Sequence, residues 1–473
     1  MKSTRLSRLA SVVASAMLAA CANFSGIEPQ SQSKSATDLS LSSTPMQWPD
    51  EQWWRAYKDP VLSTLIAQAL ANNPGIKLAQ ARLAQVAALS ANARSLESAQ
   101  LGLGIQSIRE RFTENGLIPP PFAGATNSSN SFMLNASYEI DFWGKNRAAL
   151  DAALSSESAA QAELKSARLL IAASVAKSYF SMAGALEQKG NLQTMLAQHE
   201  LLLSLISQRV AAGMDSQFEL NQAEASIPAI RAETIRQEEH IALMRNVLAA
   251  LTGSGQGSTS ELTASLPVIV TSSLPDAIPA DLIGRRADIA AARSRVMVVS
   301  KQIEVAKAEF YPNVNLTAFV GFSSLGLSHW FDGSSRDYGI GPALSLPIFD
   351  GGRLRSNLRG KTADYDAALE SYNLTLLEAV HDVADQVAAL RSLALQQKQQ
   401  VALQQSVESS YQLEQQRERA GMVSKLSTLN AQSAVLQQRK SAIELKARAL
   451  DLSVNLNRAL GGGFGAPLSA DTL

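Results

Sequence analysis

A single cysteine stands among the 473 residues, and the formal net charge is zero because 42 lysines and arginines match 42 aspartates and glutamates. One cysteine excludes an intramolecular disulfide. Without a basic field, nucleic-acid binding is not expected. The sequence also lacks metal-ligand spacing and any arrangement of nucleophile and base, so we expect no enzyme, no metal and no cofactor. The four scattered histidines are His199, His240, His329 and His381.

Aromatic residues make up only 5% of the chain, although 46% of it is hydrophobic. After the N-terminal region, no stretch holds 18 or so uninterrupted apolar residues, which excludes a helical inner-membrane protein. Alanine and leucine carry much of the apolar content. This composition suits long, closely packed helices better than a compact enzyme core.

The N-terminus is typical of a secretory signal peptide over residues 1–20. Its apolar stretch of about 12 residues is too short to cross a bilayer as a helix, which takes roughly 20. Leu18-Ala19-Ala20-Cys21 resembles a bacterial lipobox, and the following Ala22 resembles the outer-membrane sorting pattern. We therefore predict that Cys21 is a lipid-attachment site carrying acyl chains such as palmitate, and that residues 21–60 form a lipidated N-terminal linker.

The chain contains an internal duplication. Residues 208–216 and 416–424 share Gln, Arg, Ala, Gly, Met and Ser at matching positions. Two further matches are collinear with this one: Phe142-Trp143-Gly144 with Phe349-Asp350-Gly351, and residues 246–253 with 455–462. Three matches in the same order at nearly equal separations indicate two repeats, which we place at residues 61–264 and 265–473.

Each repeat contains two segments in which apolar and polar residues alternate. The alternation predicts four strands of about ten residues, the length that a tilted strand needs to cross a bilayer. A half-buried sheet in a soluble domain would show the same alternation. The long, polar connections at residues 115–130 and 326–337 favour the membrane alternative, because external loops of barrels have this character. The predicted strands are 101–110, 131–141, 313–323 and 338–348.

Very long helical patterns follow each strand pair. Residues 145–209 contain no proline, and their apolar residues recur at spacings of three and four. Residues 353–417 have the same length, and at 1.5 Å per residue each helix would be about 98 Å long. Returning helices complete the helical hairpins 145–252 and 353–460, while a helix at 280–308 and an N-terminal helix ending near Glu97 extend the returning side. The sequence thus predicts a mainly α protein of paired long helices with a sheet at one end.

Four strands cannot close a membrane barrel, and open strand edges in lipid leave backbone groups without partners. Two copies would give eight strands, whose interior fills with side chains, whereas three give twelve strands and a pore. We therefore expect a homotrimer with a 12-stranded β-barrel and a long periplasmic α-helical barrel. Alanines such as Ala148, Ala149 and Ala152 would permit close helix approach, although high helix propensity alone could also explain them.

Several motifs together carry a family resemblance. They are Trp53-Trp54, Asp59-Pro60-Val61-Leu62, Arg285-Arg286-Ala287-Asp288-Ile289, Ala308-Glu309-Phe310-Tyr311-Pro312 and Ala459-Leu460-Gly461-Gly462-Gly463. With the duplication, they resemble the TolC-like outer-membrane efflux proteins over nearly the whole chain from about Trp48. The lipobox and the tryptophan pair resemble the NodT/OprM-like lipoprotein branch of that family.

The resemblance implies an outer-membrane exit duct of a tripartite efflux pump, lipid-anchored and with its helical barrel in the periplasm. Such a duct passively conducts small molecules such as drugs, and so confers antibiotic resistance. Its implied partners are a periplasmic adaptor and an inner-membrane transporter of the resistance-nodulation-division type.

The resemblance also implies two kinds of site. The turns between the hairpin helices would be adaptor-docking tips, although the two glycines there could act simply as helix C-caps. The tip residues are Arg209, Gly213, Met214, Ser216, Arg417, Gly421, Met422 and Ser424. A periplasmic gate is implied at Leu426 and Asn430. Asparagine replaces the acid of the family, so a charged ring or salt-bridge lock is not expected there, and a hydrogen-bonded gate is left open.

Two other functions remain open from the sequence. A channel for type I protein secretion would have the same architecture. A structural periplasmic coiled-coil lipoprotein would explain the helices, but it would leave four strands of membrane-crossing length without a purpose.

Overall fold

The computed structural model describes residues 24–35, 38–39, 48–255, 257–267 and 281–465. They cluster into two compact units. The sheet unit comprises the described residues of Met1–Ser33, Arg82–Ala160 and Ala291–Tyr372, and the bundle unit those of Lys34–Ala81, Gln161–Ala290 and Asn373–Leu473. Each unit draws on both repeats, because a repeat contributes its strands to one unit and most of its helical hairpin to the other.

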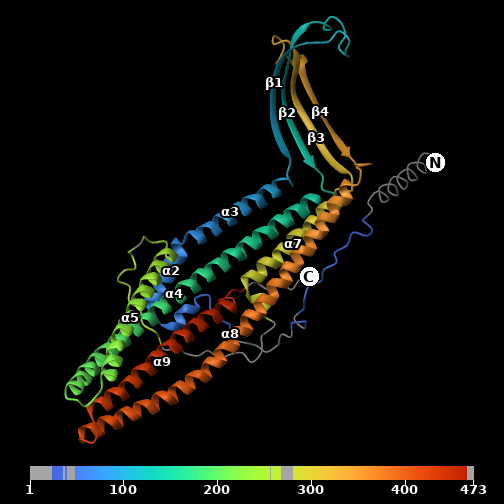
Figure 1. Cartoon of the computed structure of the whole chain (residues 1–473). Helices are drawn as coiled ribbons and strands as arrows, with labels where there is room; N and C mark the ends of the chain where they lie inside the picture. Colours follow the sequence, from blue (N-terminus) through green and yellow to red (C-terminus); the bar gives the residue numbers. More distant parts are fainter. Residues whose placement is uncertain (1–23, 36–37, 40–47, 256, 268–280, 466–473) are drawn as a thin grey trace. The chain divides into compact units, whose positions relative to one another are not determined.

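Most of the described chain is helical (Figure 1). In chain order the elements are η1 (Trp53–Tyr57), α2 (Pro60–Asn72), α3 (Pro74–Ser95), β1 (Gln100–Arg111), β2 (Thr126–Glu139), α4 (Lys145–Ala211), α5 (Gln217–Leu251), α6 (Leu282–Arg285), α7 (Ala287–Ala308), β3 (Asn313–Leu325), η2 (Gly333–Ser335), β4 (Arg336–Ser345), α8 (Arg353–Arg419) and α9 (Lys425–Ala459). The expected duplication of a strand pair, a long helix and a returning helix is confirmed. α4 and α8 have 67 residues each, and α5 and α9 have 35 each.

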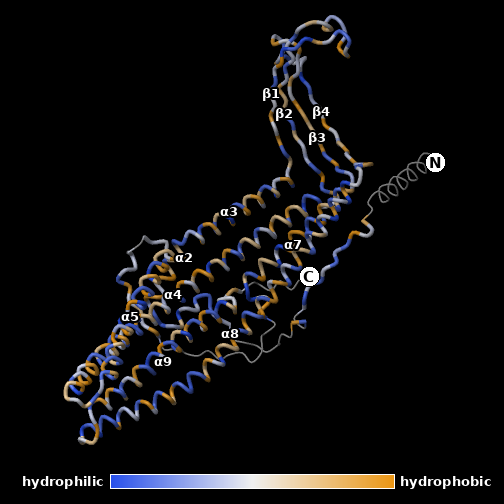
Figure 2. The backbone as a smooth tube through the Cα atoms, viewed as in Figure 1, coloured by the Kyte–Doolittle hydropathy of each residue, from blue (hydrophilic) through white to orange (hydrophobic). Residues whose placement is uncertain are grey.

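The four strands form one antiparallel sheet in the order β1-β2-β3-β4. Its register places apolar residues of all four strands side by side, as in the row Leu103, Leu134, Val320 and Tyr338. The intervening rows carry mostly glycine and polar side chains, so hydropathy alternates along the strands (Figure 2).

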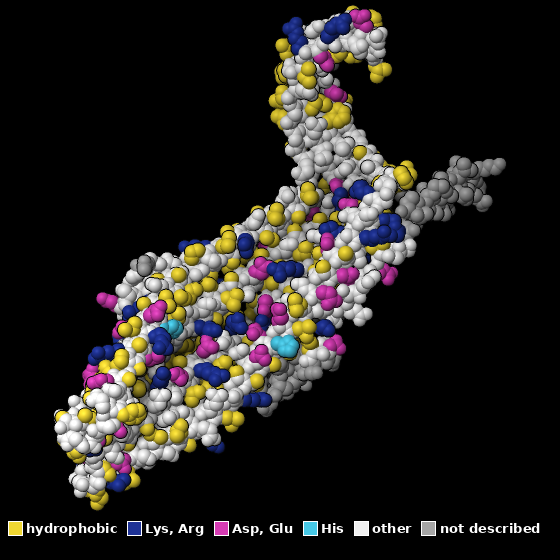
Figure 3. Space-filling model, viewed as in Figure 1, with side chains coloured by type: hydrophobic (Ala, Val, Ile, Leu, Met, Phe, Trp, Pro, Cys, Tyr) yellow, Lys and Arg dark blue, Asp and Glu magenta, His cyan; other side chains and the backbone are white. Residues whose placement is uncertain are grey.

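Most of the apolar face of the sheet is not covered by other described residues, although Phe331 packs against Phe132 and Phe322 at its far end. Leu103 is 57% exposed, Val320 54% and Tyr338 77%, and hydrophobic side chains are visible on the surface of the sheet (Figure 3). A soluble sheet buries such a face against a second layer. This sheet instead presents it outward, as a strand pair facing lipid would.

The strand bounds differ slightly from the expected ones. β2 begins at Thr126 instead of 131, because five further residues pair with β1 up to Arg111. β4 runs from 336 to 345 instead of 338–348. It ends before Pro347, which has no backbone N–H to donate to a ladder.

The predicted helix at 280–308 is wrong as a single element. Residue 280 lies outside the described residues, α6 ends at Arg285, and Arg286 is extended with φ −116° and ψ 130° before α7 begins at Ala287. The N-terminal helix is likewise divided, at Asn73 and Pro74. Proline disfavours a helical conformation in the residue before it, and the Asn73 side chain accepts a hydrogen bond from Gly75 N at 2.8 Å.

The bundle unit has a large apolar core around the middle of α4. Trp53, Trp54 and Tyr57 of η1 pack there with Tyr179 and Phe180 of α4 and with residues of α2, α5 and α9. Among the described residues, α4 is the one helix long and apolar enough to suit a membrane span. Its apolar residues from Ala172 to Ala185 are instead buried in this core.

Candidate functional site

The turn between α4 and α5, which we call the first tip, is built on a glycine C-cap. Gly213 has φ +72°, Gly213 N donates to Val210 O at 2.9 Å, and Met214 N donates to Arg209 O at 2.8 Å. This pair of hydrogen bonds is the Schellman motif, in which a left-handed glycine satisfies the last carbonyls of the helix. The glycine therefore ends α4 in the way that the C-cap interpretation of the sequence predicts.

An ion pair closes the first tip. Arg209 donates from Nε and Nη2 to both carboxylate oxygens of Asp215, at 2.7 and 2.8 Å. Beyond it, Ser216 and Glu219 form a reciprocal capping box that begins α5. A turn tied at both ends in this way presents a defined surface, because few of its backbone groups remain free to rearrange.

The turn between α8 and α9, the second tip, repeats the C-cap but is crossed by a different ion pair, in which Lys425 Nζ lies 3.3 Å from Glu418 Oε1. Gly421 has φ +74°, and Met422 N donates to Arg417 O at 2.9 Å. Val423 occupies the position of Asp215, so Arg417 pairs instead with Glu414 inside its own helix, at 2.8 Å. Ser424 makes no side-chain capping bond. The second tip is therefore held across its turn by the Glu418–Lys425 pair and by Ser427 Oγ, which donates to Glu414 Oε2 at 2.7 Å, and it lacks the bidentate arginine contact of the first tip.

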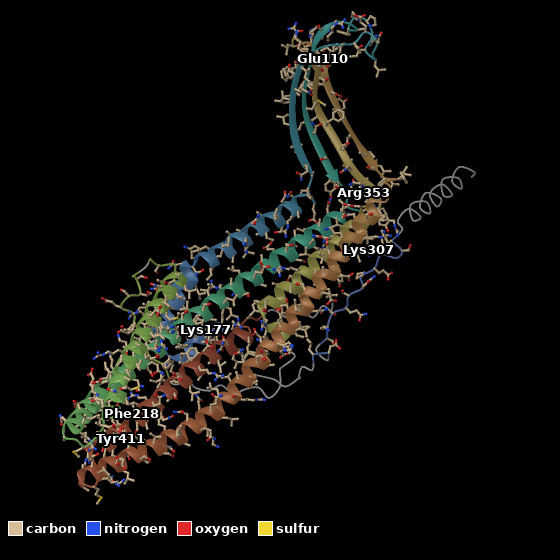
Figure 4. All side chains as sticks on the ribbon, in the orientation of Figure 1. Glu110, Lys177, Phe218, Lys307, Arg353 and Tyr411 are labelled. Atoms are coloured by element: carbon tan, nitrogen blue, oxygen red, sulfur yellow. The ribbon has the colours of Figure 1, made fainter. Side chains whose placement is uncertain are left out.

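Both tips expose apolar side chains. Met214 is 63% exposed, Phe218 71% and Met422 73%, and Figure 4 shows Phe218 near the end of its hairpin. Methionine and phenylalanine at the end of a helical hairpin have no internal packing role at this exposure. Unbranched, adaptable methionine side chains suit a protein-binding surface.

The two predicted gate residues lie just beyond the second tip, one helical turn apart on α9. Leu426 is partly buried against an apolar cluster formed by Leu202, Ile206, Ala223 and Leu429, which we call the tip cluster. Asn430 is exposed. Within one chain, therefore, Leu426 is fixed by contacts from α4 and α5, whereas the Asn430 amide is available to another molecule.

A row of buried amides joins α4 to α9 and was missed from the sequence. Gln198 Nε2 donates to Leu429 O at 2.7 Å, Asn191 Nδ2 to Leu436 O at 3.1 Å, and Gln188 Nε2 to Lys440 O at 2.8 Å. Asn191 and Gln198 stand seven residues apart, as do their acceptors Leu429 and Leu436. That heptad spacing of amides in a helical seam was the signal that could have revealed the pairing of these helices.

The first tip should respond to acid through its ion pair. The hydrogen bonds from Arg209 hold the pKa of Asp215 below its ordinary value of 3.8. The folded-state pKa is thus below the unfolded one, so the pair contributes stability above the unfolded pKa and loses it as the pH falls through the folded pKa. A spin label at Ala212 should keep the same mobility from about pH 7 to about pH 5 and become more mobile only as the pH falls below 3.8, the ordinary pKa of an aspartate.

Asp215→Asn removes the titrating group and is the matched variant for this measurement. The label in that variant should already be mobile at neutral pH and should not respond to the same acid range. An Asp215→Asn protein whose label is as immobile as in the unmodified tip at pH 7 would contradict the role of the ion pair.

Comparison with known proteins gives consistent matches along the chain. Residues 65–254 and 278–462 match the family model described as outer membrane efflux protein. The chain is 32% identical over 425 residues to the multidrug resistance outer membrane protein MdtQ of Escherichia coli O6:H1, covering 88% of this chain and 89% of MdtQ. It is 35% identical over 367 residues to the fusaric acid resistance protein FusA of Burkholderia cepacia, covering 75% and 69%.

A solved structure shows the same fold. The outer membrane protein VceC of Vibrio cholerae superposes with a TM-score of 0.81 at 34% identity, over 88% of this chain and 100% of VceC. The Campylobacter jejuni CmeC outer membrane channel superposes with a TM-score of 0.80 at 23% identity, over 93% and 95%, a likeness of fold.

Proposed function

The chain belongs to the outer membrane efflux protein family, and from this premise we propose that it is the exit duct of a tripartite resistance-nodulation-division pump. It is an efflux channel of the outer membrane. In the proposed assembly it conducts small molecules such as drugs passively, without catalysing a reaction, from a periplasmic adaptor and an inner-membrane transporter to the outside.

The observation that carries this proposal is the uncovered apolar face of the four-stranded sheet. An apolar face made by rows such as Leu103, Leu134, Val320 and Tyr338 is stable in contact with lipid and costly in water. The outer strands β1 and β4 each pair with one described neighbour only. Their free edges need partners in a bilayer, because no water is available there to satisfy backbone groups.

A homotrimer satisfies both requirements. Pairing of β1 of one copy with β4 of the next closes a barrel of twelve strands, and the glycine-rich and polar rows then line its interior. The long hairpins α4–α5 and α8–α9 would enclose the periplasmic continuation of the same pore. Heat-resistant trimers extracted from the outer membrane, and conductance after reconstitution in planar bilayers, test this assembly.

The tips are the proposed adaptor-docking surfaces. The exposed Met214, Phe218 and Met422 offer apolar contacts at the ends of both hairpins, and the two C-cap glycines hold these ends in a fixed turn. MdtQ and FusA are named for resistance to drugs and to fusaric acid, which supports small-molecule export. Affinity purification from crosslinked cells should recover an adaptor and an inner-membrane transporter.

Cys21 lies outside the described residues, and its acylation remains a proposal. It is supported by the lipobox and by the course of the described chain that follows. Phe24, three residues later, packs edge-on against Phe310 with ring centroids 5.1 Å apart, and Ile27 is buried beside Phe310. Phe310 lies three residues before the start of β3 at Asn313, so the described segment from Phe24 is held near the strands.

Substitution of the gate residues should widen the pore. Leu426→Ala together with Asn430→Ala removes an apolar side chain and an exposed amide one turn apart, and we expect a severalfold rise in single-channel conductance in planar bilayers. In the proposed gate, any hydrogen bonds between Asn430 amides of neighbouring copies would be lost with the amide. The matched control is Asn221→Ala, which removes an exposed amide from α5 and should leave conductance unchanged.

Unchanged conductance in the double variant would remove Leu426 and Asn430 from the gate while leaving the channel assignment intact.

The rival assignment, protein secretion, is tested separately. Deletion of the gene should increase sensitivity to small toxic compounds, and loss of a secreted protein without such sensitivity would favour the rival.

A further inference from the structure

Three exposed cations lie where the strands of the sheet unit meet the helices. Lys307 stands at the end of α7 just before β3, and Arg353 begins α8 after β4, with Arg359 in its second turn. The register joins these ends, because Asn313 of β3 pairs with Ser345 of β4 and Glu139 of β2 with Asn315. Figure 4 shows Arg353 and Lys307 close below the strand ends.

The three cations have no carboxylate partner within salt-bridge distance among the described residues, although the region contains acids. Those acids have other partners. Glu139 pairs with Lys145, Asp141 accepts from Arg147 N at 2.9 Å, and Asp350 caps α8 by accepting from Gly352 N and Leu354 N, each at 2.9 Å. The three cations therefore have charged groups that are not occupied by a direct ion pair, while the neighbouring carboxylates are held by other hydrogen bonds.

Exposed apolar and aromatic residues occupy the same level. Ile348 is 89% exposed and Phe349 92%, in the connection between β4 and α8. In the corresponding connection after β2, Trp143 stacks on Tyr311 with ring centroids 4.5 Å apart and donates to Pro312 O at 2.9 Å. Indole and phenyl groups at strand ends are typical of the boundary between hydrocarbon and headgroups in membrane barrels.

One of the cations also lines a hollow in this region. A cavity of about 360 Å³ is bordered by Trp143, Lys145, Tyr311 and Arg353, together with Leu354 and the periplasmic ends of β2, β3 and β4. Its three acidic lining residues all accept hydrogen bonds: Glu139 and Asp141 as described above, and Glu309 from Asn357 Nδ2 at 3.3 Å. A phosphate group in this cavity would lie next to the Arg353 guanidinium and the aromatic rings of Trp143 and Tyr311.

We propose that Lys307, Arg353 and Arg359 bind the phosphates of anionic phospholipids in the inner leaflet of the outer membrane. The occupant is a lipid because the cations lie beside exposed apolar residues that acyl chains can cover, which a free phosphate cannot do. Lipids with a net negative charge are favoured over zwitterionic ones because the three cations have no salt-bridge partner among the described residues, whereas the nearby carboxylates already accept hydrogen bonds, Glu309 from Asn357 Nδ2 at 3.3 Å. The inference rests on the membrane location of the sheet and not on conduction through the pore.

The proposal predicts which lipid the full-length protein retains. Protein reconstituted with equal amounts of phosphatidylglycerol and phosphatidylethanolamine is extracted in mild detergent, and the retained lipids are counted by native mass spectrometry. The protein should retain phosphatidylglycerol preferentially. The triple variant Lys307→Gln, Arg353→Gln, Arg359→Gln should lose at least about tenfold in that preference, since each cation near an anionic surface contributes about fivefold.

The matched control removes three exposed cations from the bundle unit: Arg55→Gln, Lys77→Gln and Lys398→Gln. It changes the net charge equally and should keep the preference. Equal preference in the two triple variants, or no preference in the unmodified protein, would overturn the proposal.

A second measurement does not depend on folding of the variant. Retention of phosphatidylglycerol by the unmodified protein should fall steeply as salt is raised from about 0.1 M to about 1 M, because the Debye length shortens from about 10 to about 3 Å. Retention that does not respond to salt would contradict a phosphate site. Conductance is recorded for the same protein samples. A protein that conducts but shows no lipid preference would contradict the lipid site alone, whereas a protein that does not conduct would contradict the channel assignment.

Discussion

Arg286→Met should remove most of the heat-resistant trimer, with a loss of about 3–5 kcal/mol of folding free energy per chain. The Arg286 side chain is only 11% exposed. It donates from Nε and Nη2 to Asp288, at 3.1 and 2.7 Å, and from Nη1 to Ala459 O at 3.0 Å. Nη1 also lies 3.6 Å from Asp382 of α8.

The reason for the large effect is that one guanidinium serves three elements. It holds the extended residue between α6 and α7, the C-terminal end of α9 and a carboxylate of α8. Without it, Ala459 O loses a donor, and among the described residues Asp382 keeps one ion-pair partner, Arg458 at 3.3 Å. Methionine fills a similar volume but cannot donate, so the loss reflects the removed hydrogen bonds and not a cavity.

Arg285→Met is the neighbouring control. Arg285 is exposed and lies over the Trp48 ring at 5.5 Å from its centroid, an interaction of about 0.5–1 kcal/mol. The measurement for both variants is the fraction of trimer surviving a temperature series in detergent. If Arg286→Met and Arg285→Met trimers survive equally, the guanidinium network is not what holds this junction.

Gly461→Ala should be nearly as damaging. Gly461 follows Leu460, the C-cap of α9, with φ +84°, and Gly462 N donates to Asn457 O at 2.9 Å. An added Cβ would overlap the carbonyl oxygen of Arg285 and lie 2.9 Å from its carbonyl carbon. Both atoms belong to the backbone and cannot move aside as a flexible side chain would, so several kcal/mol should be lost.

Alanine substitutions at two other glycines distinguish the cost of the left-handed backbone conformation from the cost of the overlap with Arg285. Gly213 has φ +72° but nothing within 4 Å of an added Cβ, so Gly213→Ala should cost only the left-handed conformation, about 1–2 kcal/mol. Gly190 lies within α4, also with open space around it, and Gly190→Ala should stabilise by up to about 1 kcal/mol. The expected order of trimer survival is Gly190→Ala, Gly213→Ala, then Gly461→Ala. Equal survival of the last two would show that the contact with Arg285 carries no cost.

Much of the candidate site was predictable because its signals are local. A glycine after a long helical pattern predicts a C-cap, and both Gly213 and Gly421 have that role. The difference between the tips was not predicted. It depends on whether Arg209 or Arg417 finds a carboxylate across its turn, and Asp215 and Val423 decide that only once the turn brings their side chains close.

The sequence by itself determined the duplication, the lengths of the hairpin helices and the alternation of the strands. Each of these is a periodicity of neighbouring residues, and the backbone geometry of a helix or strand converts it directly into a face. The tertiary structure alone decided the pairing of β2 with β3, the break at Arg286 and the amide row from Gln188 to Gln198. Those features join residues more than 150 positions apart or depend on a side chain that bonds three elements at once, so no local pattern encodes them.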